Sequence, residues 1–318
     1  MRILAGLLLA LAAHAAHADG DALAWLQRIH TATEKLSYTG TFVYRSGDQS
    51  ETSRIIHIVG RNGTRERLET LDGQRREILR SGNEVKCYLP DSMTVKVDKQ
   101  TDHTVFPKLL PANLQDINEH YEVSKGGVER IAGYDCQAIV LEPKDKMRYG
   151  HKLWADTNTG MLLKSQTLDD KNAVVEQFTF TQIAIGGKID HGQLKSSFLA
   201  KSRDWHVENS GAVATSLAAS GWTIKPNLPG FKKVTEMRRT QGGSSEVGHV
   251  VFSDGLAAVS VFIEPMAKKT SLPQPGLSRQ GAINIYSWQL DNHLVTVVGE
   301  APAESVKKLA ESVEHRKP

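Results

Sequence analysis

The side chains that could do chemistry are scattered along this 318-residue chain and form no compact motif. The sequence has 12 histidines but no His-Glu-x-x-His segment and no Cys-x-x-Cys pair. A metal site needs several ligands that converge on one point. Isolated histidines such as His57, His103, His120 and His151 are therefore interpreted as surface or strand residues. The sequence predicts neither a metal site nor a cofactor.

Nucleophilic and acid–base catalysis also lack their usual residue patterns. No Gly-x-Ser-x-Gly segment is present, and the Ser-x-x-Lys match from Ser305 to Lys308 has none of the companion motifs of its enzyme class. Glu66 and Glu69 could be imagined as an acid and a base, but residues three apart on a strand point to opposite faces. We therefore predict no catalytic residue and do not expect an enzyme.

The first 18 residues have the pattern of a secretory signal peptide. Arg2 gives a positive start, residues 3–13 are an apolar run too short to span a bilayer, and Ala16-His17-Ala18 is a small-x-small cleavage site. Cleavage after Ala18 is predicted. Because no cysteine stands directly after that site and no later apolar run is long enough to span a membrane, we expect a soluble protein outside the cytosol, without a lipid anchor.

The two cysteines, Cys87 and Cys136, leave two alternatives open. Export makes a disulfide chemically feasible, and closing this loop would contribute about 4 kcal/mol in the chain-entropy model. The other alternative is a pair of free thiols on separate strands. The sequence cannot show whether their Cα atoms come within bridging range.

The formal charge of +3 is too close to neutral to indicate a nucleic-acid partner. Local basic clusters remain at Lys232-Lys233, Arg238-Arg239 and Lys268-Lys269. Each could contact an acidic protein or a phosphorylated lipid head group.

Hydrophobic periodicity predicts a chain dominated by strands. Residues 19–36 have helical spacing, and from Tyr38 to about Ile185 short alternating runs are joined by tight turns such as Asp72-Gly73, with a short helix over 112–118. Turns this short favour an antiparallel meander. So many strands in one open sheet should curl, which gives an unclosed barrel with helices on its concave side.

A boundary is predicted near residue 200, where a polar stretch with Gly186-Gly187 interrupts the pattern. The smaller second part, 201–318, contains a hairpin around Asp254-Gly255, a second hairpin, and a terminal helix that begins near Pro302. Four strands and one helix predict an α+β unit. The chain as a whole is therefore assigned to the α+β class, with residues 19–200 and 201–318 as its two domains.

The inner surface of such a sheet can hold an apolar ligand if side chains do not fill it. Candidate residues for that lipid pocket are Phe42, Tyr44, Leu89, Leu153 and Phe178. The alternative is a closed core without a guest.

Several blocks of the sequence resemble those of one family. The stretches YTGTFVYR, RERLETLDGQRREILR, KDKMRYGHKLWADTNTGMLLKSQTL, EQFTFTQI, SDGLAAVSVFIEPM and HLVTVVGEAP, in this order, resemble the RseB/MucB family of periplasmic regulators of the envelope-stress sigma factor (sigma-E/AlgU type). The resemblance covers almost all of the chain after the signal peptide. It is the combination of blocks that is specific, since any single block would be a weak match.

The resemblance implies a fold and a function. The family's larger domain is similar to the lipoprotein carriers LolA and LolB, and its smaller C-terminal domain is the main partner-binding part. The implied function is to bind the periplasmic domain of an RseA/MucA-type anti-sigma factor, shield it from regulated proteolysis, and release it when lipopolysaccharide or mislocalised lipid signals envelope stress. On this basis Arg238 and Arg239 are candidate contacts to an acidic partner or a lipid phosphate. The alternative function is a periplasmic lipid or lipoprotein carrier, and the oligomeric state, including a homo-oligomer, stays open.

Overall fold

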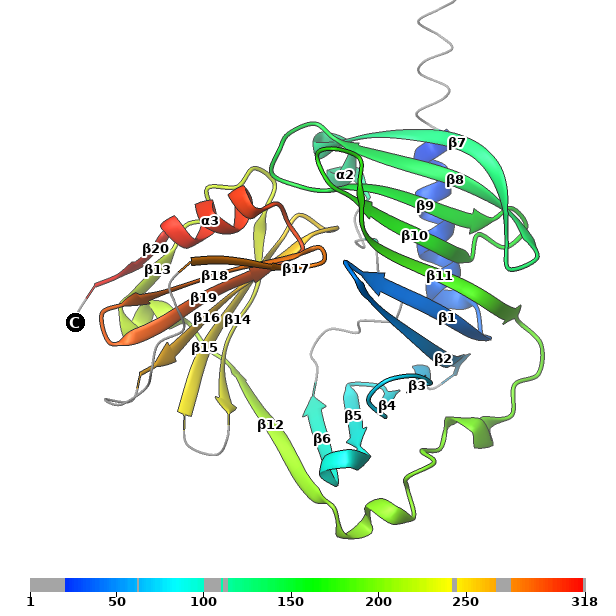
Figure 1. Ribbon diagram of the computed structural model, residues 1–318, viewed down its shortest axis with the longest axis horizontal. Helices are drawn as coiled ribbons and strands as arrows, with labels where there is room; N and C mark the ends of the chain where they lie inside the picture. The colour runs from blue at the N-terminus through cyan, green and yellow to red at the C-terminus, as the bar shows by residue number, and fades with distance from the viewer. Residues whose placement is uncertain are drawn as a thin grey trace, which may run out of the picture.

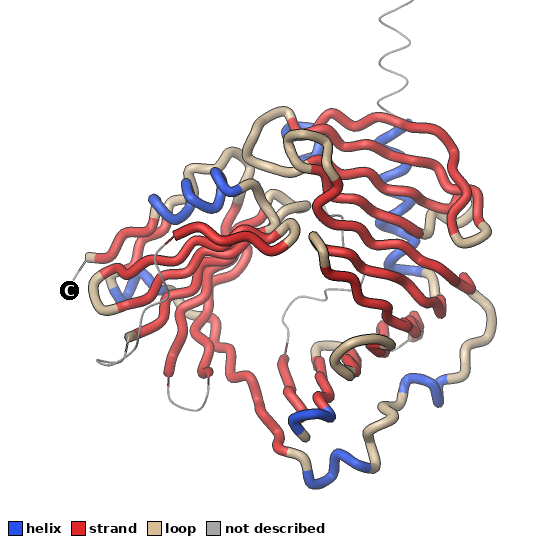
Figure 2. Tube along the Cα trace, in the orientation of Figure 1, coloured by secondary structure: helices blue, strands red, loops and turns tan. Residues whose placement is uncertain are grey.

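The computed structural model describes residues 21–61, 63–99, 110, 114–241, 245–266 and 276–316. The predicted signal peptide lies outside these residues. Within them the protein is mostly β-structure, with a large N-terminal sheet and a second, C-terminal β domain (Figures 1 and 2). No helix in the described ranges is long and apolar enough to cross a membrane.

The N-terminal sheet contains strands β1 to β11, all paired antiparallel. In space the order is β6–β5–β4–β3–β2–β1–β11–β10–β9–β8–β7, so the meander folds back where β1 pairs with β11. The strands are β1 (Tyr38–Ser46), β2 (Gln49–Gly60), β3 (Gly63–Thr70), β4 (Glu77–Ser81), β5 (Glu84–Leu89), β6 (Thr94–Lys99), β7 (Tyr121–Ile131), β8 (Tyr134–Pro143), β9 (Gly150–Asp156), β10 (Leu162–Leu168) and β11 (Val174–Ile185).

Two helices accompany this sheet. The N-terminal helix, residues 21–35, lies across one face of the sheet (Figure 1) and buries Trp25, Leu26 and Ile29 against the strands that carry Ile139 and Leu153. Its apolar residues recur at helical spacing, which is why one side packs and the other stays polar. The short helix α2 (Gln115–His120) corresponds to the one predicted over 112–118. A 3-10 turn, η1 (Pro90–Ser92), joins β5 to β6.

The C-terminal domain is built from a second antiparallel sheet, in the order β12–β14–β15–β16–β19–β18–β17, and a separate pair, β13 with β20. Helix α3 (Ala303–Glu311) packs Val306, Leu309 and Ala310 into its core. The strands are β12 (His206–Ala214), β13 (Trp222–Ile224), β14 (Lys232–Gln241), β15 (Ser245–Ser253), β16 (Ala258–Pro265), β17 (Gly276–Gln280), β18 (Ile283–Leu290), β19 (His293–Gly299) and β20 (Val313–His315).

This domain has more strands than the sequence indicated. Strand β17 precedes the second hairpin, and the predicted terminal helix ends at Glu311, after which β20 pairs with β13. β17 has no buried residue and β20 is only three residues long, so neither has a local period that distinguishes it from a loop. The expected α+β unit is thus a β domain with one packed helix.

Strand β12 connects the two sheets. Its first residues pair in parallel with β6, as in Val207 opposite Val95, and its last residues pair antiparallel with β14, as in Val213 opposite Arg238. The chain between β11 and β12 contains two 3-10 turns, η2 (His191–Leu194) and η3 (Lys201–Asp204), and is drawn mainly as loop in Figure 2. A further turn, η4 (Leu217–Ser220), precedes β13.

Candidate functional site at the domain junction

A loop of the N-terminal sheet enters the C-terminal domain. It joins β8 to β9, and its Arg148 is buried at 3% exposure. Arg148 Nη1 donates to Asp254 Oδ2 at 2.6 Å, and Nη2 donates to the Pro229 carbonyl oxygen at 2.6 Å. Nε and Nη2 also donate to the two Asp145 oxygens, each at 3.1 Å. A buried guanidinium of this kind is tolerated because its donors are satisfied.

The Asp254 carboxylate, which accepts from Arg148, has further hydrogen-bond donors. Asp254 lies in the β15–β16 turn, and its Oδ1 accepts hydrogen bonds from the backbone N–H groups of Leu256 at 3.0 Å and Ala257 at 2.8 Å. The aromatic rings of Tyr121 and Phe231 lie 5.6 Å and 5.5 Å from the Arg148 guanidinium carbon. Burial, and then the charge of Asp254, raise the pKa of Tyr121 well above its ordinary value. The ion pair therefore sits in an apolar, aromatic setting between the domains.

The neighbours of Arg148 on this loop also bind the C-terminal domain. Met147 belongs to that domain's hydrophobic core, and its carbonyl oxygen accepts a hydrogen bond from Ser305 Oγ at 2.7 Å. On the other side, the Tyr149 hydroxyl accepts from Asn284 Nδ2 at 2.9 Å, and the same amide donates to the Ala301 carbonyl at 2.8 Å. The loop of residues 144–149, called the plug below, therefore fixes one domain on the other.

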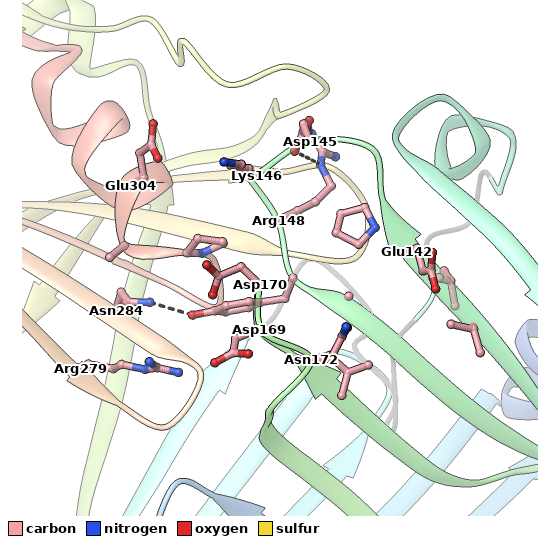
Figure 3. A pocket seen from close by; sticks show the side chains of 18 residues that line it. Glu142, Asp145, Lys146, Arg148, Asp169, Asp170, Asn172, Arg279, Asn284 and Glu304 are labelled. Carbon is pink, nitrogen blue, oxygen red and sulfur yellow. Dashed lines mark hydrogen bonds and ion pairs between the residues drawn. The ribbon is translucent and has the colours of Figure 1, made fainter.

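A cleft of about 610 Å³ lies beside this plug. Figure 3 shows that its labelled side chains come from both sides of the junction, with Glu142 on β8 and Glu304 on α3. Among the lining residues that carry charge, acids outnumber bases: Glu142, Asp145, Asp169, Asp170 and Glu304 against Lys146, Arg148 and Arg279. Apolar side chains, among them Leu141 and Leu168, complete the wall. A cleft with both polar and apolar walls can accommodate a chain segment of another molecule.

Metal binding requires several ligand side chains close together. Within the described ranges, no group of three or more His, Cys, Asp or Glu side chains lies close enough to hold a metal ion. His151, on β9, is half-buried, and desolvation lowers its pKa to about 4, so it is neutral at ordinary pH.

The residues predicted to line a lipid pocket share one face of the N-terminal sheet. Tyr44 lies opposite Phe178, Phe178 opposite Ser165, and Ser165 opposite Leu153, and cross-strand partners point to the same side. Register through β2, β3, β4 and β5 places Leu89 on that side too. This is the face covered by the N-terminal helix.

The five predicted pocket residues differ in how deeply they are buried, and therefore in how much space they leave for a bound lipid. Phe42, Leu153 and Phe178 are packed in hydrophobic clusters at 2–4% exposure, Phe42 only 5.1 Å from Phe178 between ring centroids. Tyr44 and Leu89 are half-buried. Their role in binding lipid stays a prediction.

Arg238 and Arg239 are adjacent on β14, but the structure does not bring them together at one contact. Arg238 pairs with Glu246 at 3.0 Å and with the Ser220 hydroxyl, while Arg239 lies 3.7 Å from Asp98 on β6. Because neighbours on a strand point to opposite faces, they cannot contact one ligand side by side. Their role in partner or lipid binding also stays a prediction.

Both cysteines are free thiols in the structure, which corresponds to the second of the two alternatives. Cys136 on β8 is fully buried in a hydrophobic cluster, and burial followed by the charge of Asp156 raises the pKa of its thiol to about 12. Cys87 on β5 is half-buried, and burial raises its pKa as well.

The sequence did not reveal the plug. The run Lys144–Lys146 reads as a solvated turn, and only the apolar pair Met147 and Tyr149 around Arg148 signals that this loop packs against something. Together these features define a class: a mostly-β protein of two parts with a polar cleft where they meet.

Comparison with known proteins then identifies the family. The profile of the MucB/RseB N-terminal domain matches residues 21–198, and that of the MucB/RseB C-terminal domain matches residues 216–314. The chain is 32% identical over 301 residues to the sigma factor AlgU regulatory protein MucB of Pseudomonas aeruginosa, covering 92% of this chain and 90% of MucB.

Two solved structures agree over the same length. The chain resembles MucB in a crystal structure of its complex with MucA(peri), with a TM-score of 0.70, 29% identity and coverage of 92% and 98%. It resembles a chain of the Pseudomonas aeruginosa MucA/MucB complex with a TM-score of 0.72, 28% identity and coverage of 94% and 100%. The chain belongs to the MucB/RseB family, whose members are regulatory proteins of the sigma factors sigma-E and AlgU.

Proposed function

We propose that this protein binds the periplasmic segment of an RseA/MucA-type anti-sigma factor and, while bound, shields that segment from regulated proteolysis. The observation that carries the proposal is the similarity of nearly the whole chain to MucB crystallised with MucA(peri). A protein with this function needs no bond-making chemistry, because occupying the partner is enough. The predicted signal peptide supports action in the periplasm.

The cleft at the domain junction is the proposed docking site for part of the partner. It is lined by both domains, so a bound segment would contact the N-terminal sheet and the C-terminal domain together. The excess of acidic groups in its wall favours a segment that carries basic side chains.

This site is tested by filling the cleft. Asp170 lies in the turn between β10 and β11 and lines the cleft, whereas the exposed Lys171 beside it does not. The substitution Asp170→Trp should weaken binding of the periplasmic segment of the cognate MucA-type protein about tenfold, which corresponds to roughly 1.4 kcal/mol. The matched variant Lys171→Trp should bind within about twofold of the wild type. Calorimetry of the full chain measures both.

Wild-type affinity in Asp170→Trp would move the docking site elsewhere while leaving the function intact. A wild-type chain that does not bind the segment at all would refute the function itself.

Lipid release is the second half of the proposal. The N-terminal sheet is taken to curl as an unclosed, LolA/LolB-like barrel, which is supported by the helix on the face that carries Phe42, Tyr44, Leu89, Leu153 and Phe178. An acyl chain or lipopolysaccharide bound there during envelope stress would lower occupancy of the partner, provided that lipid prefers the free form. Half-buried Leu89 and Tyr44 are the parts of this face that a guest could reach.

The C-terminal domain is proposed to begin near residue 201 and to supply the basic contacts. Replacing Arg238 and Arg239 together with alanine should weaken partner or lipid binding several-fold at low salt, and the difference should shrink as salt screens the charges. Lys225→Ala, an exposed cation of the same domain, is the control. Equal affinities at low salt would exclude both arginines from the site.

A further inference from the structure

Two carboxylates from different domains meet at a second contact of the junction. Glu176 is on β11 of the N-terminal sheet, and Glu300 directly follows β19 of the C-terminal domain. Gly299, next to Glu300, lies opposite Asn284. Ala282, two residues before Asn284, packs against Val175, next to Glu176. The charge of Glu300 also raises the pKa values of both Glu176 and Tyr44.

The backbone around Glu176 is part of this contact. Its neighbour Val175 packs in a buried cluster with Tyr149 and with Ala282 of the C-terminal domain. Ser46, opposite Glu176 on β1, lies against Gly281, where a β-carbon would overlap the serine. The β1–β2 turn and the β17–β18 turn therefore touch with no room between them, and the side chains of Gln49 and Gln280 bond across at 3.2 Å.

No positive charge is among the causes of the pKa shift of Glu176. On the C-terminal side of the contact, the cation Arg279 donates to the Gly281 carbonyl oxygen at 2.8 Å. The groups that face Glu176 from β1 are the Tyr44 hydroxyl, which hydrogen-bonds the carboxylate, and Ser46; from β10 it is Thr167. Beyond Thr167 comes His151 of β9, which is neutral at ordinary pH. Glu176 Oε2 is buried and has no hydrogen-bond partner among the described residues.

We propose that Glu176 and Glu300 form a pH-sensitive contact between the two domains, closed when Glu176 holds a proton and loosened when it ionises beside Glu300. The proposal concerns the domains of this chain alone and does not depend on the proposed partner. A proton on Glu176 allows it to donate a hydrogen bond, whereas the ionised pair brings two like charges together where water is partly excluded.

The direction of the effect follows from the proton balance. Burial first, and the charge of Glu300 second, raise the pKa of Glu176 from 4.5 to about 7. Glu300 keeps contact with solvent, and partial loss of water raises its pKa as well. Between pH 4.5 and about pH 7, the closed form binds more protons than an open form in which Glu176 has its ordinary pKa. The population of the closed form therefore rises as pH falls and drops as pH rises. The ratio of closed to open molecules should change about tenfold per pH unit until Glu176 is ionised in both forms.

The test uses hydrogen exchange of the full chain, measured on peptides that contain Gly47 and corrected for the intrinsic rate at each pH. The Gly47 amide donates to the Val175 carbonyl at 3.1 Å within the N-terminal sheet, and Gly281 of the C-terminal domain covers it, so opening of the contact uncovers this hydrogen bond to water. In the wild type its protection should fall about tenfold per unit over the range from about pH 5 to about pH 7. In Glu176→Gln, which cannot ionise, the contribution of Glu176 should be absent, so that protection falls much less steeply over that range and only the contribution of Glu300 remains. Protection of Val261, deep in the C-terminal sheet, verifies that each variant is folded.

Two further variants keep the test decisive. Glu300→Gln removes the second charge at a solvent-exposed position and lowers the pKa of Glu176 in the closed form. The fall in protection should therefore be smaller and should end at lower pH than in the wild type. Glu122→Gln, an exposed glutamate of β7 away from the contact, should retain the wild-type profile. If both Glu176→Gln and Glu300→Gln kept the wild-type profile, the proposal would be overturned.

Discussion

Replacing Arg148 with methionine is expected to lower the free energy of unfolding by about 3–5 kcal/mol, the usual effect of removing one partner of a buried ion pair. Methionine keeps much of the apolar stem but leaves the Asp254 carboxylate buried and uncompensated. It also removes the donor of the Pro229 carbonyl. Denaturant titration of the full chain measures the loss. The matched control is Arg130→Met, an exposed arginine on β7, which should change stability by less than about 0.5 kcal/mol.

A double-mutant cycle separates the ion pair from general packing at the junction. Asp254→Asn alone should also be costly, because it breaks the same pair while keeping the Oδ1 acceptor for Leu256 and Ala257. Combined with Arg148→Met, its additional cost should be small, since no charge is then left unpaired. Strict additivity of the two single effects would show that Arg148 and Asp254 do not stabilise one another.

The sequence predicted the elements whose signals are local. Alternation with period two marked the strands, and Asp72-Gly73 and Asp254-Gly255 marked turns that the structure contains between β3 and β4 and between β15 and β16. The first helix is recognisable because Trp25, Ile29 and Ala32 recur at helical spacing over the described residues 21–35. In each case the residues that determine the element are within a few positions of one another.

The junction was not predicted because its determinants are far apart in the chain. Arg148 and Asp254 are 106 residues apart, and each sits in a segment that reads as an ordinary polar turn. Likewise, Glu176 alone is one polar residue on a strand, and its raised pKa depends first on burial and then on the charge of Glu300 from the other domain. Periodicity shows which residues share a face, as it did for Phe42 and Tyr44, but not which turn contacts that face.

The dependence of the C-terminal domain on the plug also changes how that domain can be studied in isolation. A fragment of residues 201–318 keeps the sheet and α3 but lacks Met147, which is 8% exposed in that domain's core, and the Tyr149 hydroxyl that Asn284 contacts. Replacing a methionine in a protein core with alanine typically costs about 2–5 kcal/mol of stability. We therefore expect the fragment to be less stable than the same residues in the intact chain by about that amount.

Two substitutions decide whether the lost plug is the cause. In the fragment, Asp254→Asn should cost less than about 1 kcal/mol, because Arg148 is absent and the carboxylate is exposed, against about 3–5 kcal/mol in the intact chain. Val297→Ala, deep in the same core, should cost about the same in both backgrounds, since its neighbours belong to the C-terminal domain itself. Denaturant titration of both forms provides all four values. An equal cost of Asp254→Asn in the two backgrounds would mean that the N-terminal sheet does not stabilise the C-terminal domain through this loop.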